Sequence, residues 1–510
     1  MYNALCLCIA MTVSQGGSPS YDSTPSTPQF TPATTTNTSP YSPANMLPEA
    51  NQPPGQSQIS VDTTPPTGPA NLPYLDPNSP ISRTPARTTS RRQDKKDDPD
   101  KKDPDKKDDE KKDEEKKEEE KFFFMKMLSN TPTGDFMDKN RLSFSGWTEM
   151  SFTGSQASVS NLPVTWNDRA NRFLLQQQWM RFERTLDTDS KEASWGFRVD
   201  TLAGTDYRFT LMRGLFNQQL LNSAGNQNLY GLDLPQAYVN WYLPNLFEGT
   251  EIRLGRMFTP WGFESIEGIS TPLLSRSYAF NWSPPFTHMA LMVAPNFNKN
   301  WSAKLMLANG NDVFFDASEE LRTVGVVSWI SDDKKDNLNF GWSLGRGKFN
   351  ASAPFNPENN GLQSEPAGRN NINTFDLVYS HEFTDKFTYA FEGIFGYQYG
   401  VPANIPGGII KEGVTSGTAH WGSFAQYFIY KWDEKLSSII RAELFDDMEG
   451  QRTGYEGLYE AVTVGVQYKP KPWLWFRPEI RYDYNGLSKA FNNGTQHGLL
   501  TAATDMIIRW

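Results

Sequence analysis

The chain contains few side chains whose types and spacing suit catalysis. Its only cysteines, Cys6 and Cys8, lie within the first ten residues, so the rest has no disulfide, thiolate nucleophile or cysteine metal site. The sequence lacks a Gly-x-Ser-x-Gly elbow, a phosphate-binding loop and a His-Glu-x-x-His motif. The four histidines are too far apart for a local metal motif. They are His288, His381, His420 and His497.

Acidic residues are the remaining candidates for chemistry. Glu264 with Glu267, or Asp446 with Asp447, could supply the acid–base pair of a glycosidase, but that reaction requires a particular separation of the two carboxylates. Four other acids could bind calcium, yet they lack EF-hand spacing and are better explained as solvated loop residues. They are Asp312, Asp316, Glu319 and Glu320. We therefore expect no enzyme activity, no cofactor and no metal.

Charged residues also recur at alternate positions within apolar segments. In 472–484, for example, Ile480 and Tyr482 alternate with Arg481 and Asp483. Such alternation is typical of a strand with one dry face and one wet face. We expect eight of these charges to face a lumen: Arg198, Asp200, Arg441, Glu443, Arg477, Glu479, Arg481 and Asp483.

A repeated strand unit must position these charges. From Arg141 to Trp510, segments of about ten alternating residues are separated by turns or loops, which predicts about 16 strands, within a range of about 14 to 18. Short and long connections follow one another, as in an all-β, antiparallel up-and-down barrel with tight turns at one end. The predicted strands are 142–152, 171–184, 193–203, 233–243, 250–258, 286–294, 300–308, 321–330, 337–346, 372–383, 387–399, 418–432, 435–445, 457–468, 472–484 and 499–510.

The barrel is predicted to span a membrane. About sixteen strands enclose a lumen too wide for side chains to fill, so the polar faces should point inward and the apolar faces toward lipid. Aromatic residues such as Trp241 and Trp432 gather at strand ends, as in the girdles that mark a membrane–water boundary. The alternating end, Met506, Ile508 and Trp510, resembles the C-terminal insertion signal of outer-membrane barrels, which most often ends in Phe.

Two further segments resemble a known family. The stretch LGRMFTPWGFE (254–264) and the later SPPFTH (283–288) are similar to a strand-and-loop segment of the putative beta-barrel porin-2 (OmpL-like) family. Met289 and Ala290 stand where that family tends to place a glycine. The resemblance covers about 141–510 and implies an outer-membrane porin with passive transport. It implies no particular solute.

The first 121 residues differ in composition from the barrel segment. Residues 1–13 contain an apolar stretch, 4–13, whose length suits the core of a secretory signal, without the usual basic residue before it. Residues 14–90 are rich in Pro, Ser and Thr, and 91–121 consist of Lys, Asp and Glu blocks. These compositions predict a disordered segment and then a spacer, disordered or partly helical. Residues 122–140 would link this tail to a barrel over 141–510.

Net charge excludes one class of partner. No part of the chain is strongly basic, so nothing predicts nucleic-acid binding. Residues 122–510 contain 34 basic and 40 acidic residues, a net charge of −6. This balance predicts weak ion selectivity, with a slight preference for cations.

These features together predict a water-filled channel for passive diffusion of small polar solutes and ions across the outer membrane, with the N-terminal tail in the periplasm. The expected partners are outer-membrane lipid, the barrel-insertion machinery and the diffusing solutes; a homo-oligomer is left open. The alternative is an outer-membrane barrel that mainly anchors or displays, with its tail as an envelope spacer. A soluble β-protein that binds polysaccharide is a third interpretation.

The long connection 259–285 is the candidate pore constriction. It would be the third long loop, and its many apolar residues would find cover by folding into the lumen, as the third loop does in general porins. Its charges Glu264, Glu267 and Arg276 would then stand near the wall residues Arg253 and Arg256 and create a transverse field. The alternative is that the loop packs on the outer rim or mediates subunit contact.

Overall fold

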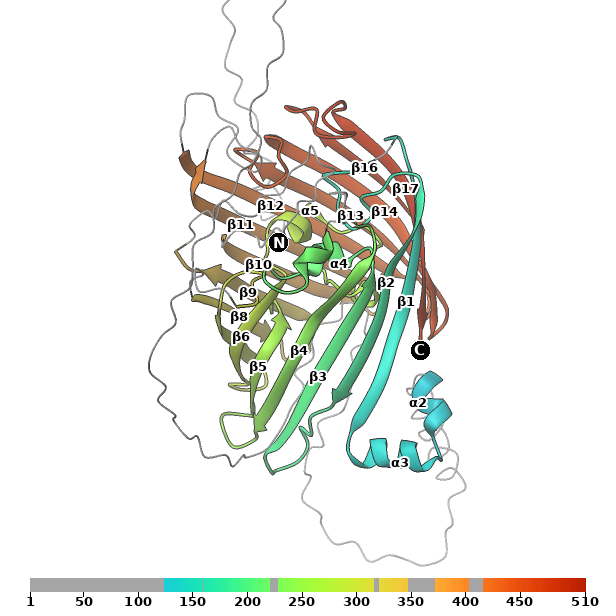
Figure 1. Ribbon diagram of the computed structural model, residues 1–510, viewed down its shortest axis with the longest axis vertical. Helices are drawn as coiled ribbons and strands as arrows, with labels where there is room; N and C mark the ends of the chain where they lie inside the picture. Colours follow the sequence, from blue (N-terminus) through green and yellow to red (C-terminus); the bar gives the residue numbers. More distant parts are fainter. Residues whose placement is uncertain (1–122, 159, 221–227, 316–320, 347–371, 403–415) are drawn as a thin grey trace, which may run out of the picture. The chain divides into compact units, whose positions relative to one another are not determined.

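The computed structural model describes residues 123–158, 160–220, 228–315, 321–346, 372–402 and 416–510. The segments expected at 1–13, 14–90 and 91–121 lie outside the described residues. One antiparallel sheet dominates the part described (Figure 1). Its strands are β1 (Leu142–Ser155), β2 (Arg172–Arg184), β3 (Ser194–Gly204), β4 (Gly231–Leu243), β5 (Thr250–Phe258), β6 (Thr287–Pro295), β7 (Trp301–Ala308), β8 (Arg322–Ile330), β9 (Asp336–Leu344), β10 (Asn373–Thr384), β11 (Phe387–Pro402), β12 (Ser416–Lys431), β13 (Leu436–Asp447), β14 (Gly457–Lys471), β15 (Leu474–Phe476), β16 (Glu479–Asn485) and β17 (Gly498–Arg509).

The sheet closes into a barrel of 16 strand positions. Apart from β15 and β16, strands adjacent in sequence pair antiparallel, and β1 also pairs with β17, so that Thr148 lies opposite Ile508. The short strands β15 and β16 share one position, because β14 and β17 each pair with both of them. The break between them falls at Arg477 and Pro478, where proline has no N–H to donate to a neighbouring strand.

The polar faces of the strands point inward and the apolar faces point outward. In β16, Ile480 and Tyr482 are 60% and 50% exposed, whereas the alternating Arg481 and Asp483 are fully buried. This pattern is the reverse of a soluble barrel and is typical of a wall that faces lipid. The expected transmembrane β-barrel is therefore confirmed, and each predicted strand end lies within three residues of an observed one, apart from the break inside 472–484.

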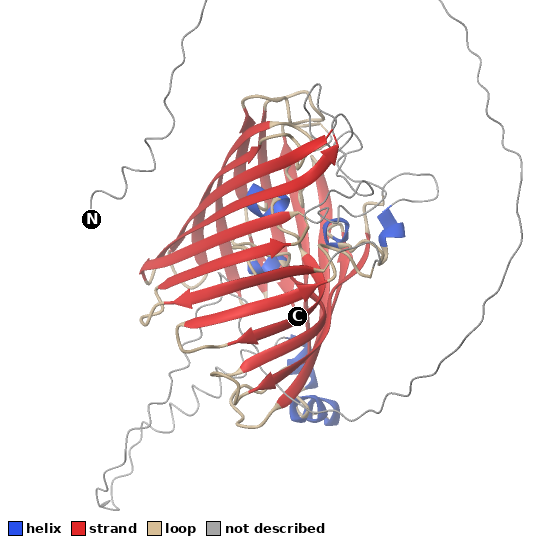
Figure 2. Ribbon diagram, turned by 90° about the vertical axis from the view of Figure 1, so that its left-hand side faces the viewer, coloured by secondary structure: helices blue, strands red, loops and turns tan. Residues whose placement is uncertain are grey.

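The long loops gather at one end of the barrel and the short turns at the other (Figure 2). The third long loop, which we call L3, comprises residues 259–286 between β5 and β6. It contains the 3-10 helix η2 (Gly268–Ser270) and the helix α5 (Tyr278–Trp282). The second long connection contains α4 (Tyr207–Thr210) and η1 (Asn217–Leu220).

The expected linker is helical over part of its length. Residues 122–140 contain α2 (Phe123–Leu128) and α3 (Pro132–Lys139), which precede β1. Among the helices described, none has both the length and the apolar character needed to cross a membrane.

Candidate functional site

L3 takes its shape from local sequence signals. Gly262 has a positive φ of 106°, a backbone conformation that favours glycine, and it turns the chain just after β5. Ser277 caps α5, because its Oγ accepts a hydrogen bond of 3.0 Å from the backbone N–H of Phe280. Pro284 and Pro285 then end this helical turn and return the chain to β6.

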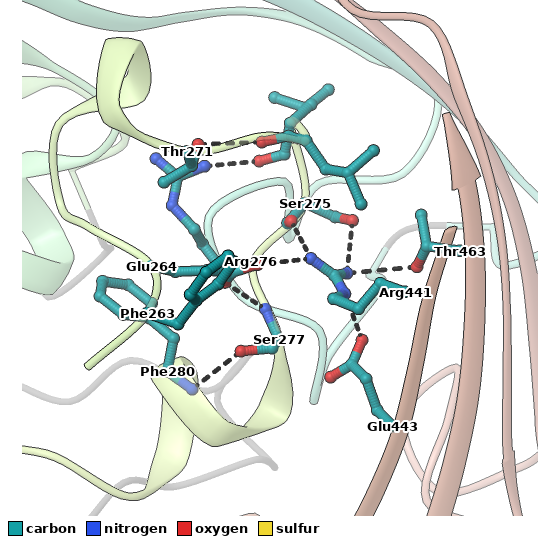
Figure 3. Close-up of polar contacts among 12 residues, drawn as sticks. Phe263, Glu264, Thr271, Ser275, Arg276, Ser277, Phe280, Arg441, Glu443 and Thr463 are labelled. Atoms are coloured by element: carbon teal, nitrogen blue, oxygen red, sulfur yellow. Dashed lines mark hydrogen bonds and ion pairs between the residues drawn. The ribbon is translucent and has the colours of Figure 1, made fainter. Parts of the chain in front are cut away.

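Arg441 of β13 contacts L3 through both an ion pair and hydrogen bonds. Its guanidinium is fully buried and pairs with Glu264 of L3 at 2.8 Å and with Glu443 of its own strand at 2.6 Å. It also donates to the backbone oxygen of Ser275 at 2.6 Å and to Thr463 at 3.2 Å (Figure 3). Two carboxylates and one loop carbonyl therefore share a single cation.

Arginines of β16 and of the break before it hold L3 through its backbone. Arg477 donates to the backbone oxygen of Gly268 at 2.7 Å, and Arg481 donates to that of Arg276 at 2.8 Å. Acids of the same wall accept N–H groups of the loop: Glu443 from Tyr278 at 2.7 Å, and Glu479 from Leu274 at 3.0 Å. Because these wall residues are buried, their hydrogen bonds to L3 are shielded from solvent competition.

The strands at the beginning of the chain hold L3 from another side. Glu267 pairs with Arg181 of β2 at 2.5 Å and with Arg198 of β3 at 2.8 Å. Asp200 binds the same two arginines. Gln177 of β2 donates to the backbone oxygen of Ile266 at 2.8 Å. L3 therefore bridges strands on different sides of the barrel interior.

The first turn of L3 contacts β9, β11 and β12. Trp261 donates through its indole N–H to the backbone oxygen of Trp342 at 3.1 Å. The backbone N–H of Phe263 donates to Glu392 at 2.9 Å, and its ring lies 4.2 Å from that of Tyr427, measured between centroids. These contacts fix the loop before its charged residues begin.

The apolar side chains of L3 are covered because they pack against the barrel wall. Trp261 and Leu273 belong to a buried cluster with Ile394 and Tyr427 of the wall. Tyr278 and Trp282 of α5 belong to a second cluster, and Ile266 and Phe280 to a third. The apolar side of L3 is thus packed against inward-facing wall residues.

The partners of the predicted constriction residues differ in part from those expected. Glu264 and Glu267 pair with Arg441, Arg181 and Arg198 instead of Arg253 and Arg256. Arg253 pairs with Glu251 at 2.9 Å on the inward face. Arg256 is also buried, with 1% of its surface exposed, and it follows Gly255, whose backbone has a positive φ of 136°.

Arg256 and Arg276 bind groups of the connections themselves. Arg256 pairs with Asp233 at 2.7 Å and donates to the backbone oxygen of Thr210 at 2.6 Å, so it holds the second long connection. The expectation that Arg256 stands beside the charges of L3 is corrected accordingly. Arg276 donates to the backbone oxygens of Ser265 at 3.0 Å and Leu274 at 2.8 Å, within L3 itself.

Burial shifts the ionisation of the loop charges. It raises the pKa of the Glu267 carboxyl above its ordinary value, and the positive charge of Arg181 opposes that shift. Burial lowers the pKa of the Arg276 guanidinium, which the negative charge of Glu149 opposes. Asp206, which precedes α4, has its pKa raised to about 7 by burial, against a hydrogen bond from Gln177.

Several contact residues were not among those predicted. Gln177, Arg181 and Glu392 bind L3, and Arg477 pairs with both Glu149 and Asp505. Alternation along the predicted strand 171–184 would have placed Arg181 on the same face as Gln177. Sequence alone has no signal for which of these inward residues meets the loop, because that depends on the register of distant strands.

The chain is similar to several solved structures and matches one sequence family. Three solved structures illustrate the likeness: an anion-selective porin from Comamonas acidovorans (9% identity, 72% of this chain and 99% of that one, TM-score 0.47), OprB from Pseudomonas putida (11%, 74% and 96%, 0.45) and OmpF from Salmonella typhi (10%, 73% and 98%, 0.44). A comparison with curated protein sequences finds no match. The sequence profile of the putative beta-barrel porin-2, OmpL-like family matches residues 141–510, so the chain belongs to this family of outer-membrane porins.

Proposed function

We propose that the barrel is a passive diffusion channel for small polar solutes and ions, and that L3 is its constriction. The observation that supports this is the charged anchoring of L3: its carboxylates and backbone groups bind inward residues of β2, β3, β13 and β16. A loop fixed in this way narrows the lumen without depending on solvent-exposed contacts. Charged pairs along the remaining opening favour polar solutes over apolar ones.

Membership in the family supports an outer-membrane location. The short-turn end of such barrels faces the periplasm, and β1 starts at that end. The N-terminal tail would then lie in the periplasm. The same proposal includes association between copies of the barrel and recognition of its C-terminal strand by the insertion machinery.

Single-channel recording in planar bilayers tests the constriction. Deletion of residues 264–280 removes most of L3 together with its charged attachments to the wall, and we expect a larger conductance per channel. Correct folding is checked by heat-modifiable gel mobility, which a collapsed barrel loses. Unchanged conductance and ion selectivity in a folded barrel would remove L3 from the permeation path.

A second candidate is a barrel that mainly anchors or displays, with the tail as an envelope spacer. The observation that favours it is the extent of packing between L3 and the wall, since three buried apolar clusters include both. A plugged lumen predicts no open-channel steps from the folded wild-type protein. Regular steps would exclude this candidate, so the same recording separates the two functions.

A further inference from the structure

The two helices before the barrel carry apolar side chains that no described residue covers. Phe123 and Met127 of α2 are 70% and 58% exposed, and Phe136 of α3 is 60% exposed. Phe123 and Met127 lie four residues apart on α2 and therefore share one face of that helix. The exposed apolar surface of these helices therefore indicates contact with an environment other than water.

The helices form a defined unit with close internal contacts. Thr131 caps α3, because its Oγ1 accepts a hydrogen bond of 3.1 Å from the backbone N–H of Gly134. Gly134 itself lies against α2: a Cβ at this position would stand 2.0 Å from the backbone oxygen of Leu128. Met125 of α2 and Met137 of α3 are buried, and the two helices contact each other and β1. The exposed apolar residues are thus held in fixed positions.

Helix α2 packs on the outer surface of the barrel. The rings of Phe124 and Phe144 meet edge to face, with centroids 5.0 Å apart, and Phe144 lies 5.7 Å from Trp510. Phe144 shares its face of β1 with the exposed Met150, whereas the opposite face carries the buried Glu149. The contact surface of α2 is therefore the lipid-facing side of the wall.

The helices also lie at the short-turn end of that wall. Arg141, two residues after α3, pairs with Asp187 at 2.7 Å and donates to Ser194 at 2.8 Å. Asp187 lies in the turn between β2 and β3, and Ser194 is the first residue of β3. Exposed aromatic residues Phe182 and Trp195 stand at the same end. This is where the aromatic girdle of a membrane barrel meets the headgroup region.

We propose that α2 and α3 lie in the membrane interface and insert Phe123, Met127 and Phe136 into the phospholipid leaflet at the short-turn end. We expect lipid to cover these side chains, because they are continuous with the outer surface that the barrel already presents to lipid. Lys126 and Lys139 close the last turns of the two helices and can reach phosphate groups, as in other interfacial helices. The helices thus attach the chain to the membrane surface before β1 begins.

Site-specific fluorescence in phospholipid vesicles tests this inference. The full chain carries Cys6→Ser and Cys8→Ser, so that a single new cysteine can be labelled with an environment-sensitive dye. At Phe136→Cys or Met127→Cys we expect blue-shifted emission that phospholipids with a nitroxide on the acyl chain quench. The matched control is Asp138→Cys on the same helix, where the emission should resemble that in water and the quenching should be several-fold weaker.

The outcomes separate lipid from other occupants. Water-like emission at both apolar positions in a heat-modifiable, correctly folded barrel would overturn the inference. Blue-shifted emission that nitroxide lipid does not quench, and that grows with the protein-to-lipid ratio, would assign the surface to a second copy of the chain and also overturn it. The readout does not depend on conductance, so failure of the channel proposal would leave it interpretable.

Discussion

At Arg441, one buried cation neutralises two carboxylates that come from different parts of the chain. Replacing it by glutamine would leave Glu264 and Glu443 buried without their common partner. Breaking a buried pair in this way costs about 3–5 kcal/mol. We expect R441Q to lower the temperature at which the barrel loses its compact gel mobility and to increase the open-channel noise, because L3 loses an ion pair and a backbone attachment to the wall.

Arg172 provides the matched control for this variant. It is exposed at the start of β2, so R172Q removes the same charge without disturbing L3. Equal losses in the two variants would mean that net charge, and not the Glu264 contact, determines the effect. A gel transition of R441Q at the wild-type temperature would contradict the assigned role of Arg441.

The ionisation of Asp206 should make the free energy of unfolding depend on pH. Its pKa is raised to about 7 in the folded protein, above the ordinary value of a carboxyl, so the folded state retains a proton that the unfolded state has lost. The free energy of unfolding should therefore fall as pH rises from about 4 to about 7, by at most about 1.4 kcal/mol per pH unit, and then level off. Asp206→Asn should flatten this slope when denaturant unfolding is followed at several pH values; an unchanged slope would exclude Asp206 as its source.

At the scale of elements, the strands were predictable because each one carries its own pattern. Alternation shows which face is wet, and the sorting of short and long connections shows that the strands close into a barrel. The break at Pro478 was missed because Arg477 and Glu479 keep the alternation across it. Proline within the predicted strand 472–484 was the available signal.

The partners of L3 were less predictable for a physical reason. Its need for cover follows from its composition, but Glu264 and Arg441 are 177 residues apart, and their contact depends on barrel register and loop path. The partners of Arg256 were not predictable either, because they come from β4 and the second long connection and not from L3. The strands of the wall can therefore be predicted from local sequence patterns, whereas the contacts of L3 depend on how distant strands are arranged.

Gly341 tests how tightly L3 rests on the wall. A Cβ at this position would stand 2.5 Å from Trp261, so Gly341→Ala must displace the first turn of L3. We expect a loss of stability of about 1–3 kcal/mol and a changed conductance. Gly393→Ala is the control, because the nearest atom to its added Cβ would be in Phe424 at 4.0 Å. If both variants conduct like the wild type, Trp261 does not position the loop.

At the scale of the whole molecule, the barrel should fold without the N-terminal tail. In the part of the chain that the structure describes, the strand pairings that close the wall lie between Leu142 and Arg509. We expect deletion of residues 14–121 to leave heat-modifiable mobility and single-channel conductance unchanged. The deletion retains α2 and α3, so their contacts with β1 persist. Failure of the shortened chain to insert would show that the tail takes part in assembly.

Ion selectivity depends on the balance of charge over the whole lumen. Most inward arginines are paired with acids, as Arg481 is with Asp483 and Arg253 with Glu251, so we expect weak selectivity with a slight preference for cations. Lys304 of β7 differs from these arginines. Trp301 and Leu305 of the same strand are exposed and point outward, so Lys304 points inward. It has no ion-pair partner among the described residues.

Reversing the charge of Lys304 should therefore shift selectivity more than reversing a charge outside the lumen. We expect K304E to move the reversal potential in a potassium chloride gradient further toward cations, because the new carboxylate attracts potassium and repels chloride along the wall. K299E is the control: Lys299 lies in a short turn, 74% exposed and paired with Asp332 at 2.8 Å, where salt screens its charge from the lumen. Equal shifts in the two variants would show that total charge, and not its position on the wall, controls permeation, and clear anion selectivity of the wild type would contradict the expected balance.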